Sequence, residues 1–343
     1  MRLLNKAAAL LALIVAMTSA RQSIAQNPAG AQGPAAAQNQ AAPIAPAPAA
    51  DPAAGDDIAV FRAGTQLVDL PVSVLDKNGK PISGIPQSAF KVYENNIEQP
   101  IKVFRSEDQP VSIGIIIDNS GSMRDKRARV AAAALALVKN SNPQDEEFIV
   151  DFNDDVYLDQ PFTSDIKKLE IALGRIDMQG GTAMRDAIST SIDYMKEKAT
   201  RDRKVLLVVT DGNDNTSNID LEPLVRKAQA SEVLIYCIGL LSEEDAHDRK
   251  SAQRALKDLA EASGGQDYYP KDLAEVEKIT PEVAHEIRNQ YILAYSPTNT
   301  ALDGTFRQIR VKLTGYGSAT VRTRNGYYAS PASSRKPSGV SFK

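Results

Sequence analysis

Four runs of largely apolar residues constrain the fold of this chain more than any other feature. They lie at 111–117, 148–150, 205–209 and 233–238. Such runs are typical of strands covered on both faces, because an exposed face would carry polar residues at every second position. Stretches of helical character separate and follow them, at 124–139, 166–176, 183–198, 221–230, 251–262 and 274–288. This alternation predicts an α/β fold, a doubly wound and mostly parallel sheet with helices on both faces.

Short alternating segments flank this core on both sides. They lie at 67–74, 90–93 and 101–104 before it, and at 291–295, 307–313 and 320–323 after it. Turns rich in Asn, Gly and Asp separate the early ones, which is typical of antiparallel strands. We therefore expect a small antiparallel β module in addition to the α/β domain. We hypothesise that the two sets pair with each other, and two separate β appendages are the alternative.

Residues 1–25 have the pattern of an export signal. A positively charged start precedes an apolar run at 7–17, and small residues allow cleavage after Ala25 or Ala20. The apolar run is shorter than the ~20 residues that a membrane-spanning helix needs. We expect a secreted or periplasmic protein with no membrane span after signal cleavage, and an uncleaved N-terminal anchor is the alternative.

Composition divides the rest of the chain into five segments. They are a disordered Ala/Pro-rich linker at 26–57, an N-terminal β segment at 58–106, the α/β domain at 107–288, a C-terminal β segment at 289–330 and a flexible tail at 331–343. The linker lacks the aromatic and branched residues that could bury enough apolar surface to order it.

Charge and residue counts exclude several kinds of site. The chain has 40 Lys and Arg against 43 Asp and Glu, with a formal net charge of −3, so we expect no nucleic-acid partner. The single cysteine, Cys237, cannot form an internal disulfide or a cysteine-based zinc site, and we expect it to be a buried apolar residue. His247 and His285 lie in charged, exposed surroundings. Oxygen ligands from carboxylates and hydroxyls remain as the main option.

Such oxygen ligands follow the ends of two predicted strands and begin one predicted helix. The five candidates are Asp118, Ser120, Ser122, Thr182 and Asp211. In open α/β sheets, ligands bind at the carboxyl ends of the strands, so we expect these side chains to meet there. Two carboxylates and three hydroxyls suit Mg²⁺, with Ca²⁺ and Mn²⁺ as alternatives, and suit zinc or copper poorly.

The charge of this set predicts how it binds a partner. Two carboxylates neutralise a divalent cation, and a cation that takes six ligands keeps an open position for a further oxygen. An Asp or Glu of a protein partner fits that position. Residues 124–129, directly after the site, contain four basic side chains. They form a solvated helix face or attract acidic partners.

The same five residues, in this order, resemble the metal-ion-dependent adhesion site of von Willebrand factor A domains. The resemblance covers residues 111–288, and all five motif positions are present. The segment at 180–188 resembles the bacterial branch of this family, and the flanks at 72–79, 90–94 and 304–311 resemble secreted acidobacterial-type relatives.

This resemblance implies a Mg²⁺ ion whose coordination an acidic side chain of a partner completes. It implies that Ser120, Ser122 and Thr182 bind the metal directly. Asp118 and Asp211 are then direct ligands or act through water. Asp186 has two interpretations that both stay open, a residue that orients the ligands or a charge at a helix N-terminus.

Other functions are less well supported by the residues. The segment from Asp211 to Glu222 has the oxygen spacing of a calcium loop but carries Thr216 where the turn needs Gly. Ser120 lacks the setting of a catalytic serine, and no phosphate-binding loop motif is present. We therefore predict a metal-dependent protein-binding module rather than an enzyme. A metal-dependent phosphoester hydrolase using the same crevice and a structural envelope protein are the alternatives, and no feature of the sequence indicates an oligomeric state.

Overall fold

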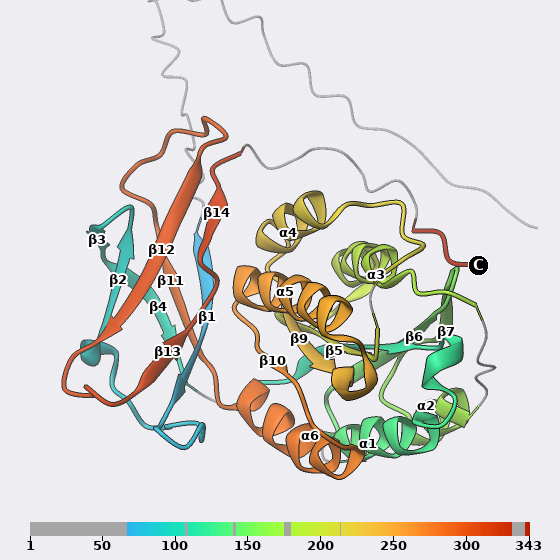
Figure 1. The fold of residues 1–343 in the computed structure, drawn as a ribbon. Coiled ribbons are helices and arrows are strands. Elements are labelled where there is room, and N and C mark those ends of the chain that lie inside the picture. Colours follow the sequence, from blue (N-terminus) through green and yellow to red (C-terminus); the bar gives the residue numbers. More distant parts are fainter. Residues whose placement is uncertain (1–66, 107–108, 140–141, 175–179, 213, 331–339) are drawn as a thin grey trace, which may run out of the picture. The chain divides into compact units, whose positions relative to one another are not determined.

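A six-stranded sheet forms the centre of the protein (Figure 1). The structure is a computed structural model that describes residues 67–106, 109–139, 142–174, 180–212, 214–330 and 340–343. In spatial order the strands are β10 (Asp267–Tyr268), β9 (Leu234–Gly239), β8 (Arg203–Thr210), β5 (Val111–Asp118), β6 (Glu146–Phe152) and β7 (Val156–Thr163). Neighbouring strands are parallel except at the edge, where β7 runs antiparallel to β6.

Helices cover both faces of this sheet (Figure 1). They are α1 (Arg127–Lys139), α2 (Ile166–Gly174), α3 (Met184–Lys198), α4 (Leu221–Gln229), α5 (Ala246–Ser263) and α6 (Leu273–Arg288). One apolar core joins the sheet to α1, α2 and α6, and the other joins it to α3, α4 and α5. Ile115 and Ile117 of β5 face the first core and Ile116 faces the second, which explains the unbroken apolar sequence of this strand. The predicted α/β fold is confirmed.

The connections of β5 and β8 leave the carboxyl ends of the two strands in different directions. These two strands are neighbours, yet the chain leaves β5 toward α1 on one face and β8 toward α4 on the other face. Ligands of open α/β sheets bind at such a point, because the two connecting loops separate there.

Two smaller antiparallel sheets contain strands from both flanks of the α/β domain. One has the order β13 (Thr320–Arg322), β1 (Val68–Leu75), β11 (Tyr291–Tyr295), β4 (Ile101–Arg105). The other has the order β14 (Gly326–Tyr328), β12 (Phe306–Leu313), β2 (Phe90–Glu94), β3 (Ile97–Gln99). Strand β1 pairs with β11, and β2 pairs with β12, so the early and late segments share both sheets. Their inner faces share one apolar core that includes Leu70, Val92 and Leu293.

A buried polar network joins this β module to the α/β domain. Glu286 of α6 accepts hydrogen bonds from the Ser73 hydroxyl of β1 at 2.9 Å and from the Tyr236 hydroxyl of β9 at 2.8 Å. Its other carboxylate oxygen pairs with Arg322 of β13. The side-chain amide of Gln290 donates to both of these hydroxyls. Both parts accordingly belong to one compact unit, Arg62–Lys343.

The structure differs from the sequence-based expectation in several elements. The edge strand β7 was not predicted, and neither were β3 and β14. Helix α5 begins at Ala246 rather than at residue 251, because the Asp245 side chain accepts hydrogen bonds from the backbone N–H groups of His247 and Asp248. Cys237 is buried and both histidines are exposed, as predicted.

The two ends of the chain are only partly within the described residues. The predicted signal peptide and linker lie outside them. The last four residues lie against the α/β domain, a contact that the expectation of a flexible tail did not include. The Phe342 ring contacts the Tyr194 ring with centroids 5.4 Å apart, and the Lys343 N–H donates to the Val156 carbonyl of β7. Among the described residues, no helix is both long and apolar enough to cross a bilayer.

The Glu286 network yields a prediction for stability. Replacing Glu286→Ala leaves the Arg322 guanidinium without its buried carboxylate, so we expect the free energy of unfolding to fall by about 3 kcal/mol. Urea denaturation measures this loss. Glu282→Ala on the exposed side of the same helix is the matched control and should change stability by less than about 0.5 kcal/mol. Equal effects of the two substitutions would contradict a joining role for Glu286.

Candidate metal centre

Asp118 occupies the carboxyl end of β5 and is fully buried. Its Oδ1 atom accepts a hydrogen bond from the Ser120 backbone N–H at 2.9 Å. Its Oδ2 atom accepts one from the hydroxyl of Thr210 at 2.5 Å. Thr210 is the last residue of β8, so this contact joins the ends of two neighbouring strands.

A chain of polar contacts connects Asp118 to the other strand end. The Ser120 and Ser122 hydroxyl oxygens lie 3.1 Å apart, and the Ser122 hydroxyl donates to Asp211 Oδ1 at 2.8 Å. Asp211 directly follows β8 and is fully buried. The structure therefore brings four of the five predicted site residues into one cluster.

Thr182 lies in a third loop and is 5% exposed. Its backbone N–H donates to the Asn215 side-chain carbonyl at 2.9 Å. The Gly180 carbonyl in the same loop accepts a 3.4 Å hydrogen bond from the Gly121 N–H of the serine turn. The hydrogen bonds of Thr182 run from its backbone to residues 215 and 216, so they join its loop to the loop after Asp211.

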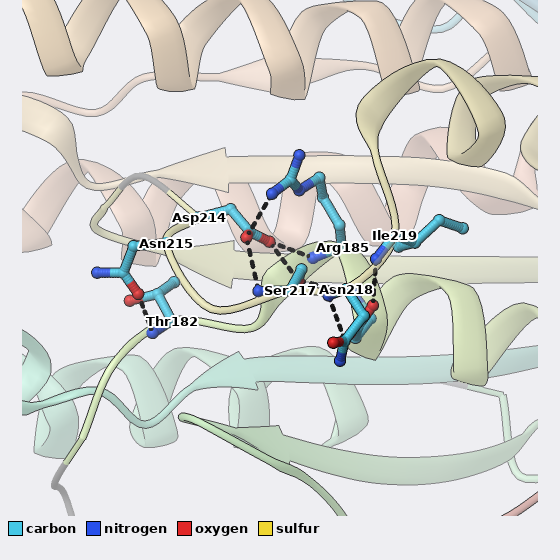
Figure 2. Close-up of polar contacts among 8 residues, drawn as sticks. Thr182, Arg185, Asp214, Asn215, Ser217, Asn218 and Ile219 are labelled. Carbon is cyan, nitrogen blue, oxygen red and sulfur yellow. Dashed lines mark hydrogen bonds and ion pairs between the residues drawn. The ribbon is translucent and has the colours of Figure 1, made fainter.

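The loop that follows Asp211 is fixed to the N-terminus of α3 (Figure 2). Asp214 accepts from the backbone N–H of Arg185 at 2.6 Å and from its guanidinium at 2.9 Å. Asp186 accepts from the backbone N–H groups of Asn218 and Ile219. Asp186 thus orients the loop, and Asp214, Asn215 and Ser217 within the loop accept hydrogen bonds from protein N–H groups.

Two glycines allow the Thr182 loop to approach its neighbours. Gly180 has a φ of +86°, and a Cβ there would lie 2.2 Å from Asp154 Oδ2. A Cβ on Gly181 would lie 2.7 Å from Asp154 Oδ1. Asp154 in turn accepts a 2.9 Å hydrogen bond from the Gly181 N–H. Residues of the β6–β7 turn therefore help to position Thr182.

Sequence reasoning did not identify several of these supporting residues. Asp154, Asn215 and Lys126 were missed, because each acts through a contact between segments that are distant in the sequence. The Thr210 hydroxyl gives one local signal, since it stands directly before Asp211 at a strand end. Lys126 is the most consequential of them: its Nζ atom lies 2.7 Å from Asp211 Oδ2, and its side chain is 12% exposed.

The electrostatics of the cluster fit a bound cation. Burial raises the pKa of Asp118 to about 6, although the hydrogen bonds from Ser120 and Thr210 lower it. Burial also raises the pKa of Glu244, and the nearby Asp211 charge adds to this, while Lys126 lowers it. Two buried carboxylates beside hydroxyl oxygens form a hard donor set that suits a divalent cation. Within the described residues no group of three or more His, Cys, Asp or Glu side chains could hold a metal, so the hydroxyls are essential to this interpretation.

A third buried carboxylate, Asp151 of β6, lies outside the cluster. Within the described part of the chain, neither of its oxygens accepts a hydrogen bond. Burial raises its pKa well above the usual range, and the neighbouring Asp159 carboxyl raises it further, while the Arg127 charge acts in the opposite direction. Burial without a hydrogen-bond partner and a neighbouring acid both disfavour the charged form, so Asp151 favours its neutral form.

The family comparison agrees with this fold. Residues 112–282 match the family model of the von Willebrand factor type A domain, so this segment of the chain is a von Willebrand factor type A domain. The resemblance seen in the sequence is confirmed at this level. A search of the curated proteins finds no match.

Several solved structures are similar to the protein. One is a von Willebrand factor type A protein from Catenulispora acidiphila, with 17% identity and a TM-score of 0.47 over 76% of this chain and 73% of that chain. Another is the vWF domain of the type V pili tip protein Mfa5 from Porphyromonas gingivalis, with 12% identity and a TM-score of 0.41 over 51% and 95%. A third is proximal thread matrix protein 1 from the mussel byssus with a zinc-occupied MIDAS motif, with 16% identity and a TM-score of 0.45 over 57% and 49%. At these identities the similarity concerns the fold alone.

The close approach at Gly181 predicts a steric effect. In Gly181→Ala the new methyl group displaces Asp154 or the Asn215 loop, so we expect the free energy of unfolding to fall by about 1–3 kcal/mol. Gly121→Ala is the matched control in the same site, because a Cβ there meets nothing within 4 Å. Urea denaturation of both variants measures the difference, and equal stability would show that the Thr182 loop is not held by this contact.

The raised pKa of Asp151 predicts a pH-dependent effect. Below about pH 3 this carboxyl is protonated in both the folded and the unfolded chain and does not affect stability. As pH rises, the unfolded chain ionises first, so the folded state loses stability until its own raised pKa is passed. We expect Asp151→Asn to be more stable than the wild type by about 1 kcal/mol at pH 8, with the gain vanishing at about pH 3.

Thermal unfolding followed across this pH range measures the gain. Asp202→Asn is the control, because that side chain is 99% exposed and should show no such dependence. A gain for Asp151→Asn that does not change with pH would exclude titration of Asp151 as its cause.

Proposed function

We propose that this protein is an exported protein-binding module that holds a divalent cation at Asp118, Ser120, Ser122, Thr182 and Asp211. Mg²⁺ is the cation that the donor set fits, with Ca²⁺ and Mn²⁺ as alternatives. The ligand is an acidic side chain of a partner protein, bound at the carboxyl ends of β5 and β8.

One observation carries the proposal. Asp118 and Asp211 are fully buried at adjacent strand ends, and the Ser120 and Ser122 hydroxyls connect them. Burying two carboxylates this close together is costly unless a cation compensates them. They lie where the connections to α1 and α4 lead to opposite faces of the sheet, the place at which open α/β sheets bind their ligands.

The protein side of the site is held in place before any ligand arrives. Thr210 and the Ser120 N–H fix the Asp118 carboxylate, and each of its oxygens keeps a second lone pair. The Asn215 and Asp154 contacts hold the Thr182 loop. A divalent cation bound here supplies a positive charge with an open coordination position, and the partner's carboxylate completes it.

Binding explains the site better than hydrolysis does. Von Willebrand factor type A domains are mostly interaction modules rather than enzymes. Asp118, the candidate nucleophile of a phosphoester hydrolase, is fully buried and has both oxygens engaged. His247 and His285 are exposed side chains of α5 and α6.

The proposal includes the place where the module acts. The export pattern of residues 1–25 and the resemblance of the flanks to secreted acidobacterial-type proteins support a secreted or periplasmic location. The Ala/Pro-rich linker at 26–57 then acts as a spacer between the N-terminus and the folded part of the chain.

The test is metal-linked stabilisation. At a Mg²⁺ concentration 100-fold above its Kd, binding to the folded state adds about 2.7 kcal/mol to the free energy of unfolding. We therefore expect the Tm to be several degrees higher in Mg²⁺ than in EDTA. Asp118→Asn keeps the shape of the side chain and loses most of this increment, whereas Asp202→Asn at the exposed position keeps it.

A binding assay completes the test. Immobilised wild type should retain a partner from envelope extract in Mg²⁺ and release it in EDTA, and the Asp118→Asn variant should retain none. Equal Tm values of the wild type in Mg²⁺ and in EDTA would contradict the metal site. Turnover of a phosphoester that Asp118→Asn abolishes would replace binding by hydrolysis.

A further inference from the structure

Lys126 places a positive charge directly on the candidate metal site. Its ammonium lies 2.7 Å from Asp211 Oδ2, while the Ser122 hydroxyl donates a hydrogen bond to Asp211 Oδ1. The Lys126 side chain is 12% exposed and that of Asp211 is not exposed at all. By contrast, the Lys139–Glu170 pair at the other end of α1 is 52% and 44% exposed, as is usual for a surface pair.

The position of Lys126 in the sequence does not account for this contact. Lys126 stands directly before α1, whose first residue is Arg127, and its carbonyl accepts from the Val130 N–H. A cation is unfavourable at a helix N-terminus, because the helix dipole is positive there. The contact with Asp211 therefore supplies the compensating interaction.

We propose that Lys126 is a tethered cation that occupies Asp211 when the site holds no metal and withdraws when a divalent cation binds. This inference rests on the proposed function and specifies how the same site is regulated. Metal binding is then an exchange of one cation for another rather than simple filling of a site.

The exchange follows from the charges present. The ammonium brings the charge of the Asp118 and Asp211 pair from −2 to −1, so it stabilises the metal-free protein. A divalent cation and an ammonium on the same carboxylate repel each other. The apparent Kd for the metal is consequently the intrinsic Kd divided by the fraction of molecules in which Lys126 is away from Asp211.

Glu244 offers the displaced ammonium a second carboxylate. It follows the short helical turn after β9, and the Arg249 guanidinium fixes its backbone by donating to the Glu244 carbonyl at 2.6 Å. Both Asp211 and Lys126 act electrostatically on its carboxyl group. The ammonium can thus leave Asp211 without losing all carboxylate contact.

Calorimetric titration with MgCl₂ tests the exchange in the whole chain. We expect Lys126→Met to lower the Kd for Mg²⁺ by about tenfold or more, because no ammonium has to be displaced. In EDTA the same variant should melt below the wild type, because Asp118 and Asp211 then repel each other without compensation. Lys139→Met removes a lysine from the exposed pair on the same helix and should leave both values unchanged.

The outcomes separate this inference from the function on which it rests. Mg²⁺ binding by the wild type with equal or weaker binding by Lys126→Met overturns the exchange and leaves the metal site standing. If Lys126→Met binds Mg²⁺ and the wild type does not, the exchange is supported, because the Lys126 ammonium then blocks the metal site completely. Absence of binding in all variants overturns the metal site itself and the exchange with it. Lys126→Gln, which keeps a polar side chain, replaces Lys126→Met if circular dichroism shows that the methionine variant is unfolded.

Discussion

The hydrogen bond from the Thr210 hydroxyl to the Asp118 carboxylate joins the two strand ends on which the site depends. It exists because β5 and β8 are parallel neighbours that end together, Ile117 being paired with Val209. The two strands then send the chain to opposite faces of the sheet, and ligands of open α/β sheets bind at such a point. Asp118, Asp211 and the serine turn are therefore brought together by the topology of the sheet, and the local loop contacts refine their positions.

The same sheet is attached to a β module built from both flanks of the domain. Glu286 accepts hydrogen bonds from Ser73 of β1 and Tyr236 of β9 and forms an ion pair with Arg322 of β13. One carboxylate therefore contacts both the β module and the central sheet. Arg203, the first residue of β8, adds a second connection by donating to the backbone carbonyls of Ile287 and Gln290. A polar junction of this kind fixes one arrangement of the β module on the α/β domain, because any shift between the two would leave a buried charge unpaired.

The sequence predicted the elements whose pattern is local. Unbroken apolar runs identified β5, β6, β8 and β9, and the D-x-S-x-S turn and the Thr-Asp pair lie where the sheet topology places them. Strand β7 was missed because it is a half-buried edge strand interrupted by Pro161, which lacks the apolar run of a central strand. The contacts of Asp154, Asn215 and Lys126 were missed because they join segments far apart in the chain. The spacing of apolar residues along the chain does not indicate that Lys126 contacts Asp211 or that Glu286 joins three elements.

The central claim is that the buried oxygens at the ends of β5 and β8 hold a divalent cation in place of Lys126. Crystals grown with MnCl₂ test it most directly, because the anomalous scattering of manganese locates the ion independently of any interpretation of the site. We expect one anomalous peak bounded by Asp118, Ser120, Ser122, Thr182 and Asp211, with the Lys126 ammonium withdrawn from Asp211. A crystal with no peak there and with Lys126 still bound to Asp211 at millimolar manganese would contradict it.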